Sequence, residues 1–89
     1  MRLRFTNQFE KQFDKISDKR IRLQITKVLQ EVKDAPLLSA VGSIKKLKGH
    51  KNTFRIRSGN YRIGLFLEQD GSITAAAVDV RGAFYKGFP

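Results

Sequence analysis

Three arginines, Arg55, Arg57 and Arg62, lie in segments where polar and apolar residues alternate as they do in β-strands. Side chains two residues apart on a strand project from the same face, so Arg55 and Arg57 are expected to point together. Phe54 and Ile56 would point the opposite way. Guanidinium groups stay charged and donate paired hydrogen bonds to phosphate oxygens. The pattern therefore predicts a rigid basic platform that binds phosphate.

The platform belongs to a longer basic segment. The chain has a formal net charge of +10, and no Asp or Glu lies between Ala35 and Leu67. A concentrated positive field attracts polyanions, of which nucleic acid is the commonest in a cell. Loop cations in this segment are expected to contact phosphates as delocalised, individually replaceable charges. The residues predicted to bind RNA in this way are Lys45, Lys46, Lys48, His50 and Lys51.

The composition limits the class of protein. The 89 residues are enough for one domain, predicted over 1–89, and a hydrophobic content of 40% argues against disorder. The absence of cysteine excludes disulfides and Cys-ligated zinc. The longest apolar run falls far short of the ~20 residues that span a bilayer, and the N-terminus does not read as a secretory signal. We therefore expect a soluble, cytoplasmic protein with no membrane partner.

The first half of the chain is expected to form the elements that pack behind this platform. Hydrophobic spacing predicts a short strand over 2–6 and two amphipathic helices over 7–16 and 18–34. Asn7 is expected to cap the first helix and Ser17 the second, because both side chains can accept hydrogen bonds from the first free backbone N–H groups. Asp18 is expected to lie in the first turn of the second helix, near its positive end. The tight joint between the helices predicts an antiparallel helical hairpin.

The second half of the chain reads as strands. A loop is expected over 35–50, with one helical turn near its start, and three strands follow over 52–57, 61–68 and 72–81. The last residues, 82–89, are predicted to be a short tail anchored by aromatic side chains. The order β-α-α-β-β-β predicts an α+β fold in which the helical hairpin packs on a small antiparallel sheet.

In this order the segments resemble the RelE/ParE superfamily of type II toxin–antitoxin toxins. The resemblance covers nearly the whole chain and rests on IKKLKGHKNTFRIRSGNYRIGLFL and on VDVRGAFYKGFP, where an arginine precedes a tyrosine by four residues. On the RelE side it implies a toxin that is an mRNA endoribonuclease (an mRNA interferase), either ribosome-dependent or free. The leading prediction is metal-independent cleavage of mRNA at the ribosome. On the ParE side it implies a DNA gyrase inhibitor without catalysis.

The resemblance also implies roles for individual residues. It places the family's charged strand positions on Arg55 and Arg57, its phosphate-stabilising arginine on Arg62, and its C-terminal pair on Arg81 and Tyr85. In such an enzyme the ribose 2′-OH attacks the adjacent phosphate, so the site must accept a proton, stabilise charge and protonate the leaving 5′-oxygen. Tyr85 could stack on a base or act as the acid. No cofactor is implied, and the implied partners are an acidic antitoxin, mRNA and the ribosome.

The chain departs from the family pattern at two places. Both charged strand positions are arginine, where RelE-like enzymes often carry lysine, and Val80 stands where many relatives have histidine. Arginine is a poor base. The proton carriers could therefore be His50, Tyr61, Tyr85 or a carboxylate. A degenerate member that only binds antitoxin is a further alternative.

The candidate residues also have structural alternatives. Arg62 lies within an apolar strand and could form an ion pair with Asp79 across the sheet. Arg81 could pair with Glu68 or Asp79. Tyr85 could serve only to lock the tail to the core.

Overall fold

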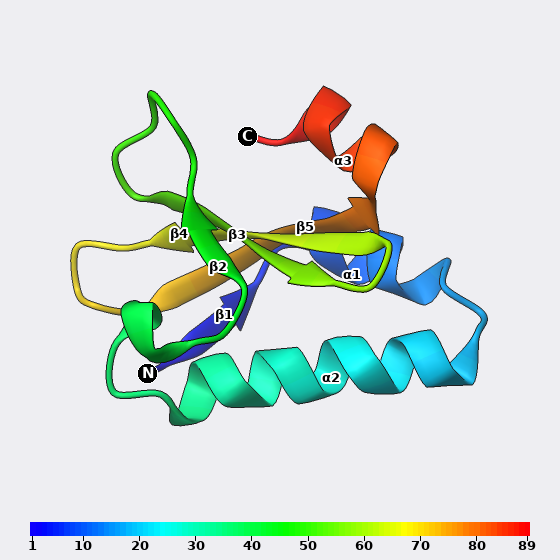
Figure 1. Cartoon of the computed structure of the whole chain (residues 1–89), viewed down its shortest axis with the longest axis horizontal. Coiled ribbons are helices and arrows are strands. Elements are labelled where there is room, and N and C mark those ends of the chain that lie inside the picture. Colours follow the sequence, from blue (N-terminus) through cyan, green and yellow to red (C-terminus); the bar gives the residue numbers. More distant parts are fainter.

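The computed structural model describes all 89 residues, which form a five-stranded sheet with helices on both sides (Figure 1). In chain order the elements are β1 (Leu3–Phe5), α1 (Asn7–Asp14), α2 (Lys19–Asp34), a 3₁₀ turn (Leu38–Ala40), β2 (Ile44–Lys46), β3 (Thr53–Ser58), β4 (Tyr61–Leu67), β5 (Ile73–Val80) and α3 (Arg81–Gly87). The predicted α+β fold, with a helical hairpin packed on a sheet, is confirmed.

The sheet is mixed, whereas an antiparallel sheet was predicted. Its strand order is β1-β5-β4-β3-β2, and β1 pairs with β5 in parallel while every other pair is antiparallel. The four later strands are joined by loops that fold each strand back beside the one before it. The chain instead leaves β1 through two helices, so no short turn forces β1 to run antiparallel to its neighbour.

Two elements lie where the sequence predicted none. β2 falls inside the expected loop over 35–50, and its three residues are too few to show a strand period. α3 begins at Arg81, the last residue of the strand expected over 72–81, and otherwise falls in the expected tail, where Gly82 and Gly87 lower the helical propensity. The predicted helical turn at the start of the loop is confirmed as the 3₁₀ turn.

The helix starts are fixed by side chains that accept backbone hydrogen bonds. Thr6, one residue before the predicted Asn7, caps α1 by accepting a hydrogen bond from the N–H of Phe9 at 3.1 Å. The Thr6 hydroxyl also donates to the carbonyl of Ala76 at 3.1 Å, which ties the helix to β5. Asp18, one residue after the predicted Ser17, caps α2 and accepts hydrogen bonds from the second and third residues of the helix.

The main core lies between the α1–α2 hairpin and one face of the sheet. Its most buried members are Phe9, Ile25, Val32, Ile56, Ile63, Leu65, Ile73, Ala75 and Val78. In Figure 1 α2 runs along one side of the sheet and α3 lies on the other side, together with the loop between β2 and β3. The second sheet face is therefore covered only in part.

Candidate nucleic-acid interface

Four cations share the sheet face that looks away from the main core. The register places Arg57 opposite Arg62, and Arg55 opposite Lys45. Residues directly opposite on neighbouring strands project from the same face, with Cβ atoms about 4.5–5.5 Å apart. We call the surface formed by Lys45, Arg55, Arg57 and Arg62 the arginine face. Ile56 points into the core, as the strand period predicted.

Three cations of the arginine face have no partner within the chain. Lys45 and Arg57 are exposed and Arg55 is half-buried, and none of them makes a side-chain hydrogen bond or an ion pair. With Ser43 and Ile44 these three line a shallow pocket of about 260 Å³ that contains no acid. Like charges on adjacent strands repel, so this arrangement is most stable when an anion lies between them.

The rim of this pocket includes a residue that the sequence did not single out. Ser43 has a φ of 61°, in the left-handed region that non-glycine residues rarely adopt, and its carbonyl accepts a hydrogen bond from the N–H of Arg57 at 3.4 Å. Backbone outliers of this kind cluster at functional sites. Nothing in the residue type signals this conformation, because serine has no preference for it.

Arg62 differs from the other members of the arginine face. It is only 8% exposed, and its Nη1 donates to the carbonyl oxygens of Gly59 at 2.9 Å and Tyr61 at 3.1 Å. These bonds hold the turn between β3 and β4 and satisfy a charge that would otherwise be costly to bury. Asp79 is its cross-strand partner by register, but no ion pair joins the two side chains.

Arg81 begins α3 and stays exposed, and its backbone N–H donates to the carbonyl of Asn60 at 2.9 Å. The start of α3 is thereby attached to the same β3–β4 turn that Arg62 holds. Arg81 forms no ion pair with Glu68 or Asp79.

The two tyrosines occupy different environments. Tyr85, on α3, is 47% exposed, and its ring lies edge-on to Phe84 with 5.1 Å between ring centroids. Phe84 and Phe88 are the buried anchors of this helix, so Tyr85 does not itself lock the chain to the core. Tyr61 packs against the main core and lies on the opposite face of β4 from Arg62.

The loop between β2 and β3 carries the remaining candidate cations. Lys46, Lys48, His50 and Lys51 line a shallow hollow of about 370 Å³ around Gly49. All four are exposed, and the His50 side chain makes no hydrogen bond. In Figure 1 this loop rises on the same side of the sheet as α3. The structure thus brings the basic loop, the arginine face and α3 to one side of the molecule.

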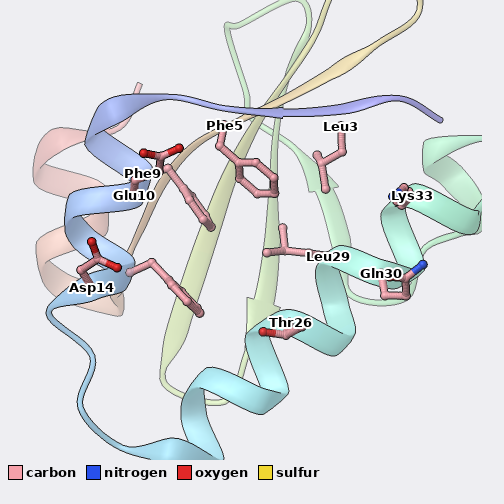
Figure 2. Close-up of a pocket in the computed structure, with 10 residues that line it drawn as sticks. Leu3, Phe5, Phe9, Glu10, Asp14, Thr26, Leu29, Gln30 and Lys33 are labelled. Atoms are coloured by element: carbon pink, nitrogen blue, oxygen red, sulfur yellow. The ribbon is translucent and has the colours of Figure 1, made fainter.

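A different kind of groove lies on the helical side. Figure 2 shows side chains from β1, α1 and α2 converging on a groove of about 500 Å³, which we call the helix groove. Its apolar lining residues are Leu3, Phe5, Phe9, Phe13 and Leu29. The Phe5 ring is 45% exposed and lies 5.2 Å from that of Phe9. Because Glu10 and Asp14 lie at the groove, its chemistry suits an apolar peptide better than a nucleic acid.

Nowhere do three His, Asp or Glu side chains come together in a way that could hold a metal ion. None of the helices has the length and apolar character needed to cross a membrane.

Comparison with known proteins establishes the family. A family model described as the ParE toxin of the type II toxin–antitoxin system parDE matches residues 3–82. Toxin RelE3 of Methanocaldococcus jannaschii is 39% identical over 70 residues, which cover 78% of this chain and 78% of that protein. The chain belongs to the RelE/ParE superfamily of type II toxin–antitoxin toxins, as its motifs predicted.

Solved structures agree with this assignment. The toxin in the RelB-RelE antitoxin-toxin complex from Methanococcus jannaschii superposes with a TM-score of 0.80 at 34% identity, covering 97% of this chain and 99% of that one. The intact RelBE toxin-antitoxin complex of E. coli matches with a TM-score of 0.71 at 25% identity, covering 90% and 95%.

Proposed function

We propose that this toxin acts as a RelE-type endoribonuclease, with mRNA bound across the arginine face. The observation that carries the proposal is the set of three unpaired cations, Lys45, Arg55 and Arg57, on adjacent strands in a pocket without acids. Cations that project from one face of adjacent strands can contact consecutive phosphates of one strand or several oxygens of one phosphate. Rigid strands hold their backbones in place, so only the side chains need to be ordered when RNA binds.

The proposed reaction is attack of a ribose 2′-OH on the adjacent phosphate. Arg55 and Arg57 would donate hydrogen bonds to the phosphate oxygens and stabilise the added negative charge. Arg62 would support them from below by holding the β3–β4 turn and by adding its positive field. Arg81 would add a further charge from the start of α3. The exposed Tyr85 is a flat, protic side chain that could stack on a base and donate a proton to the 5′-oxygen.

We further propose that the ribosome orients the 2′-OH for attack. Neither arginine of β3 is suited to remove a proton, and Tyr61 is packed against the core. A substrate held in line for attack needs less help from a strong base, because positioning alone lowers the barrier.

The partner that we propose is an antitoxin with both acidic and apolar segments. The relatives in the RelB-RelE and RelBE structures are bound to their antitoxins. In this chain the net charge of +10 favours an acidic segment over the arginine face, and the helix groove suits an apolar one. Replacing Phe5 by Asp should weaken antitoxin binding, measured by calorimetry, and leave RNA binding intact. Unchanged antitoxin affinity would contradict this assignment of the groove.

The family model for ParE supports a second candidate, inhibition of DNA gyrase without catalysis. Induced expression followed by mapping of mRNA 5′-ends and of DNA breaks separates the two. The proposal predicts new mRNA ends that disappear in Arg57→Ala and persist in the control Arg20→Ala, which removes an exposed arginine from α2. Growth arrest with intact mRNA and with gyrase-linked DNA breaks would favour the second candidate. An unaffected host would indicate a degenerate member that only binds antitoxin.

A further inference from the structure

The sequence of α3, the helix that carries Tyr85, has a low intrinsic tendency to form a helix. α3 has seven residues, two of which are glycine, and no side chain caps its N-terminus. Helices shorter than about 12 residues are marginal in isolation, and glycine is among the poorest helix formers. The helix must therefore be held by what it packs against.

Two phenylalanines attach α3 to the sheet. Phe84 and Phe88, four residues apart on one side of the helix, are 2% and 7% exposed. They pack on Ala76 and Ala77 of β5, and the N–H of Phe88 donates to the carbonyl of Phe84 at 2.9 Å. A register shift explains why two consecutive alanines face the helix, because β5 has an extra residue opposite the Gly64–Leu65 step.

Phe88 also fills the space above a glycine. A Cβ atom added to Gly64 would lie 2.6 Å from Cε1 and Cζ of the Phe88 ring, which no real contact allows. The backbone of Gly64 is not in the left-handed region, so glycine is needed there for space alone. By register Gly64 lies between Ala77 on β5 and Arg55 on β3. The ring of Phe88 therefore sits directly beside the arginine face.

Tyr85 has no attachment of its own. Its hydroxyl makes no hydrogen bond, nearly half of its surface is exposed, and its ring contact is with Phe84 of the same helix. The position of the phenol relative to the arginine face is consequently set by how α3 is anchored.

We propose that Gly64 and Phe88 are positioning residues, which set the position of Tyr85 relative to the arginine face by seating the end of α3 on β4. The inference rests on the proposed function, because the place of Tyr85 affects catalysis only where RNA lies on that face. The anchoring itself can be measured without RNA.

The test compares purified Gly64→Ala and Phe88→Ala with wild type. Gly87→Ala is the matched control, since it adds the same methyl group to α3 in open space. Hydrogen exchange of the α3 amides measures the anchoring. Single-turnover cleavage of a defined mRNA on programmed ribosomes measures the rate of the chemical step, and binding of an uncleavable 2′-deoxy analogue measures affinity. Tyr85→Phe, alone and combined with Gly64→Ala, tests whether the effect passes through the phenol.

We expect faster α3 exchange in Gly64→Ala and Phe88→Ala. Cleavage should slow by about tenfold or more, up to the loss of about 100-fold or more that a missing proton donor causes. Affinity should stay within about twofold of wild type, because phosphate contacts dominate it. Gly64→Ala should cause little further loss in the Tyr85→Phe background. If Gly64→Ala fails to fold, Phe88→Ala, which adds no atoms, decides the matter.

Unchanged α3 exchange in both variants would overturn the inference. The inference would also be overturned if the cleavage losses of Gly64→Ala and Tyr85→Phe multiplied in the double variant. Multiplying losses would show that the two substitutions act independently, and that the effect of Gly64→Ala does not depend on the Tyr85 phenol. A wild-type chain that cuts no RNA would contradict the proposed function instead. In that case the exchange data alone would decide whether Gly64 and Phe88 anchor α3.

Discussion

Arg57 and Arg62 are direct neighbours across the sheet, yet they have opposite environments. Arg57 is exposed and free of partners, whereas Arg62 is buried and donates to two backbone carbonyls. A free guanidinium in a basic pocket is available to an anion, and a guanidinium that holds a turn contributes mainly to the fold. Residue type and spacing alone did not separate these two roles.

This difference predicts that replacing Arg62 by alanine mainly lowers stability, whereas replacing Arg57 by alanine mainly weakens RNA binding. Arg62→Ala leaves the Gly59 and Tyr61 carbonyls without a donor, which should lower the free energy of unfolding by about 1–3 kcal/mol. Arg57→Ala should change it by less than about 0.5 kcal/mol while weakening RNA binding. Urea unfolding and RNA titration of both variants give the comparison. A larger loss of stability in Arg57→Ala would contradict the roles assigned here.

The environment of Asp70 predicts a pH dependence of protein stability that does not involve the arginine face. A hydrogen bond from the Ser72 hydroxyl, and then one from the Ser72 backbone N–H, hold the pKa of Asp70 below its ordinary value of 3.8, and Arg4 adds to the effect. A carboxylate whose pKa is lowered by folding stabilises the protein above its unfolded pKa. That contribution is lost as the pH falls through the folded value.

Asp70→Asn should therefore flatten the acid limb of the stability curve. Melting temperatures of wild type and variant, measured from about pH 5 down to about pH 2, should converge toward acid pH. The effect should be small, because Asp70 is exposed. Curves that stay parallel throughout this range would show that the Ser72 bonds do not favour the ionised carboxylate.

At the scale of single elements, the start of α2 depends on one side chain. Asp18 accepts hydrogen bonds from Arg20 at 2.8 Å and Ile21 at 3.3 Å. Asp18→Ala should lower the free energy of unfolding by about 1 kcal/mol. The adjacent Ser17 makes no such bond, so Ser17→Ala is the control and should leave stability nearly unchanged. Equal losses in chemical denaturation would contradict the capping assignment.

The elements that the sequence predicted are those with a clear hydrophobic period. α2 buries Ile25 and Val32 on one face, and β3 alternates Ile56 with the two arginines, so both were predictable from spacing. β2 is too short to show a period, and α3 exists because Phe84 and Phe88 are buried, which is a tertiary effect. The role of the Ala76–Ala77 pair, which is to leave room for these two phenylalanines on the sheet, becomes visible only in the folded structure.

The candidate site was predictable in part for the same reason. The strand period put Arg55 and Arg57 on one face, and the register bears this out. The bonds of Arg62 to the turn, the strained Ser43 and the contact between Gly64 and Phe88 depend on three-dimensional placement that no local pattern encodes. Whether the arginine face binds RNA stays a prediction.

At the scale of the whole molecule, charge and apolar surface are separated. The arginine face, the basic loop and α3 lie on one side, and the helix groove lies on the side of the α1–α2 hairpin. One surface can therefore serve RNA while a separate surface helps to hold an antitoxin. An acidic antitoxin segment over the arginine face would then exclude RNA by direct competition.

The concentration of cations on the arginine face predicts that RNA binding depends strongly on salt. RNA binding should weaken steeply as salt rises, because each phosphate contact to single-stranded RNA releases counterions and adds about 0.7 to the slope of log K against log salt. Arg55→Ala and Arg57→Ala should each reduce the slope by about that amount, whereas Arg20→Ala should not. A flat salt dependence of the wild type would contradict the idea of a phosphate-binding platform.

The most direct test of the central claim is the chemistry of the cut ends. Wild-type toxin, added to ribosomes programmed with a defined mRNA, should release fragments with a 5′-hydroxyl and a 2′,3′-cyclic phosphate. Cleavage should vanish when the ribose at the cut carries no 2′-OH, and it should fall sharply in Arg55→Ala and Arg57→Ala. Intact mRNA, fragments with 5′-phosphates, or full cleavage by both arginine variants would contradict attack by the 2′-OH at the arginine face.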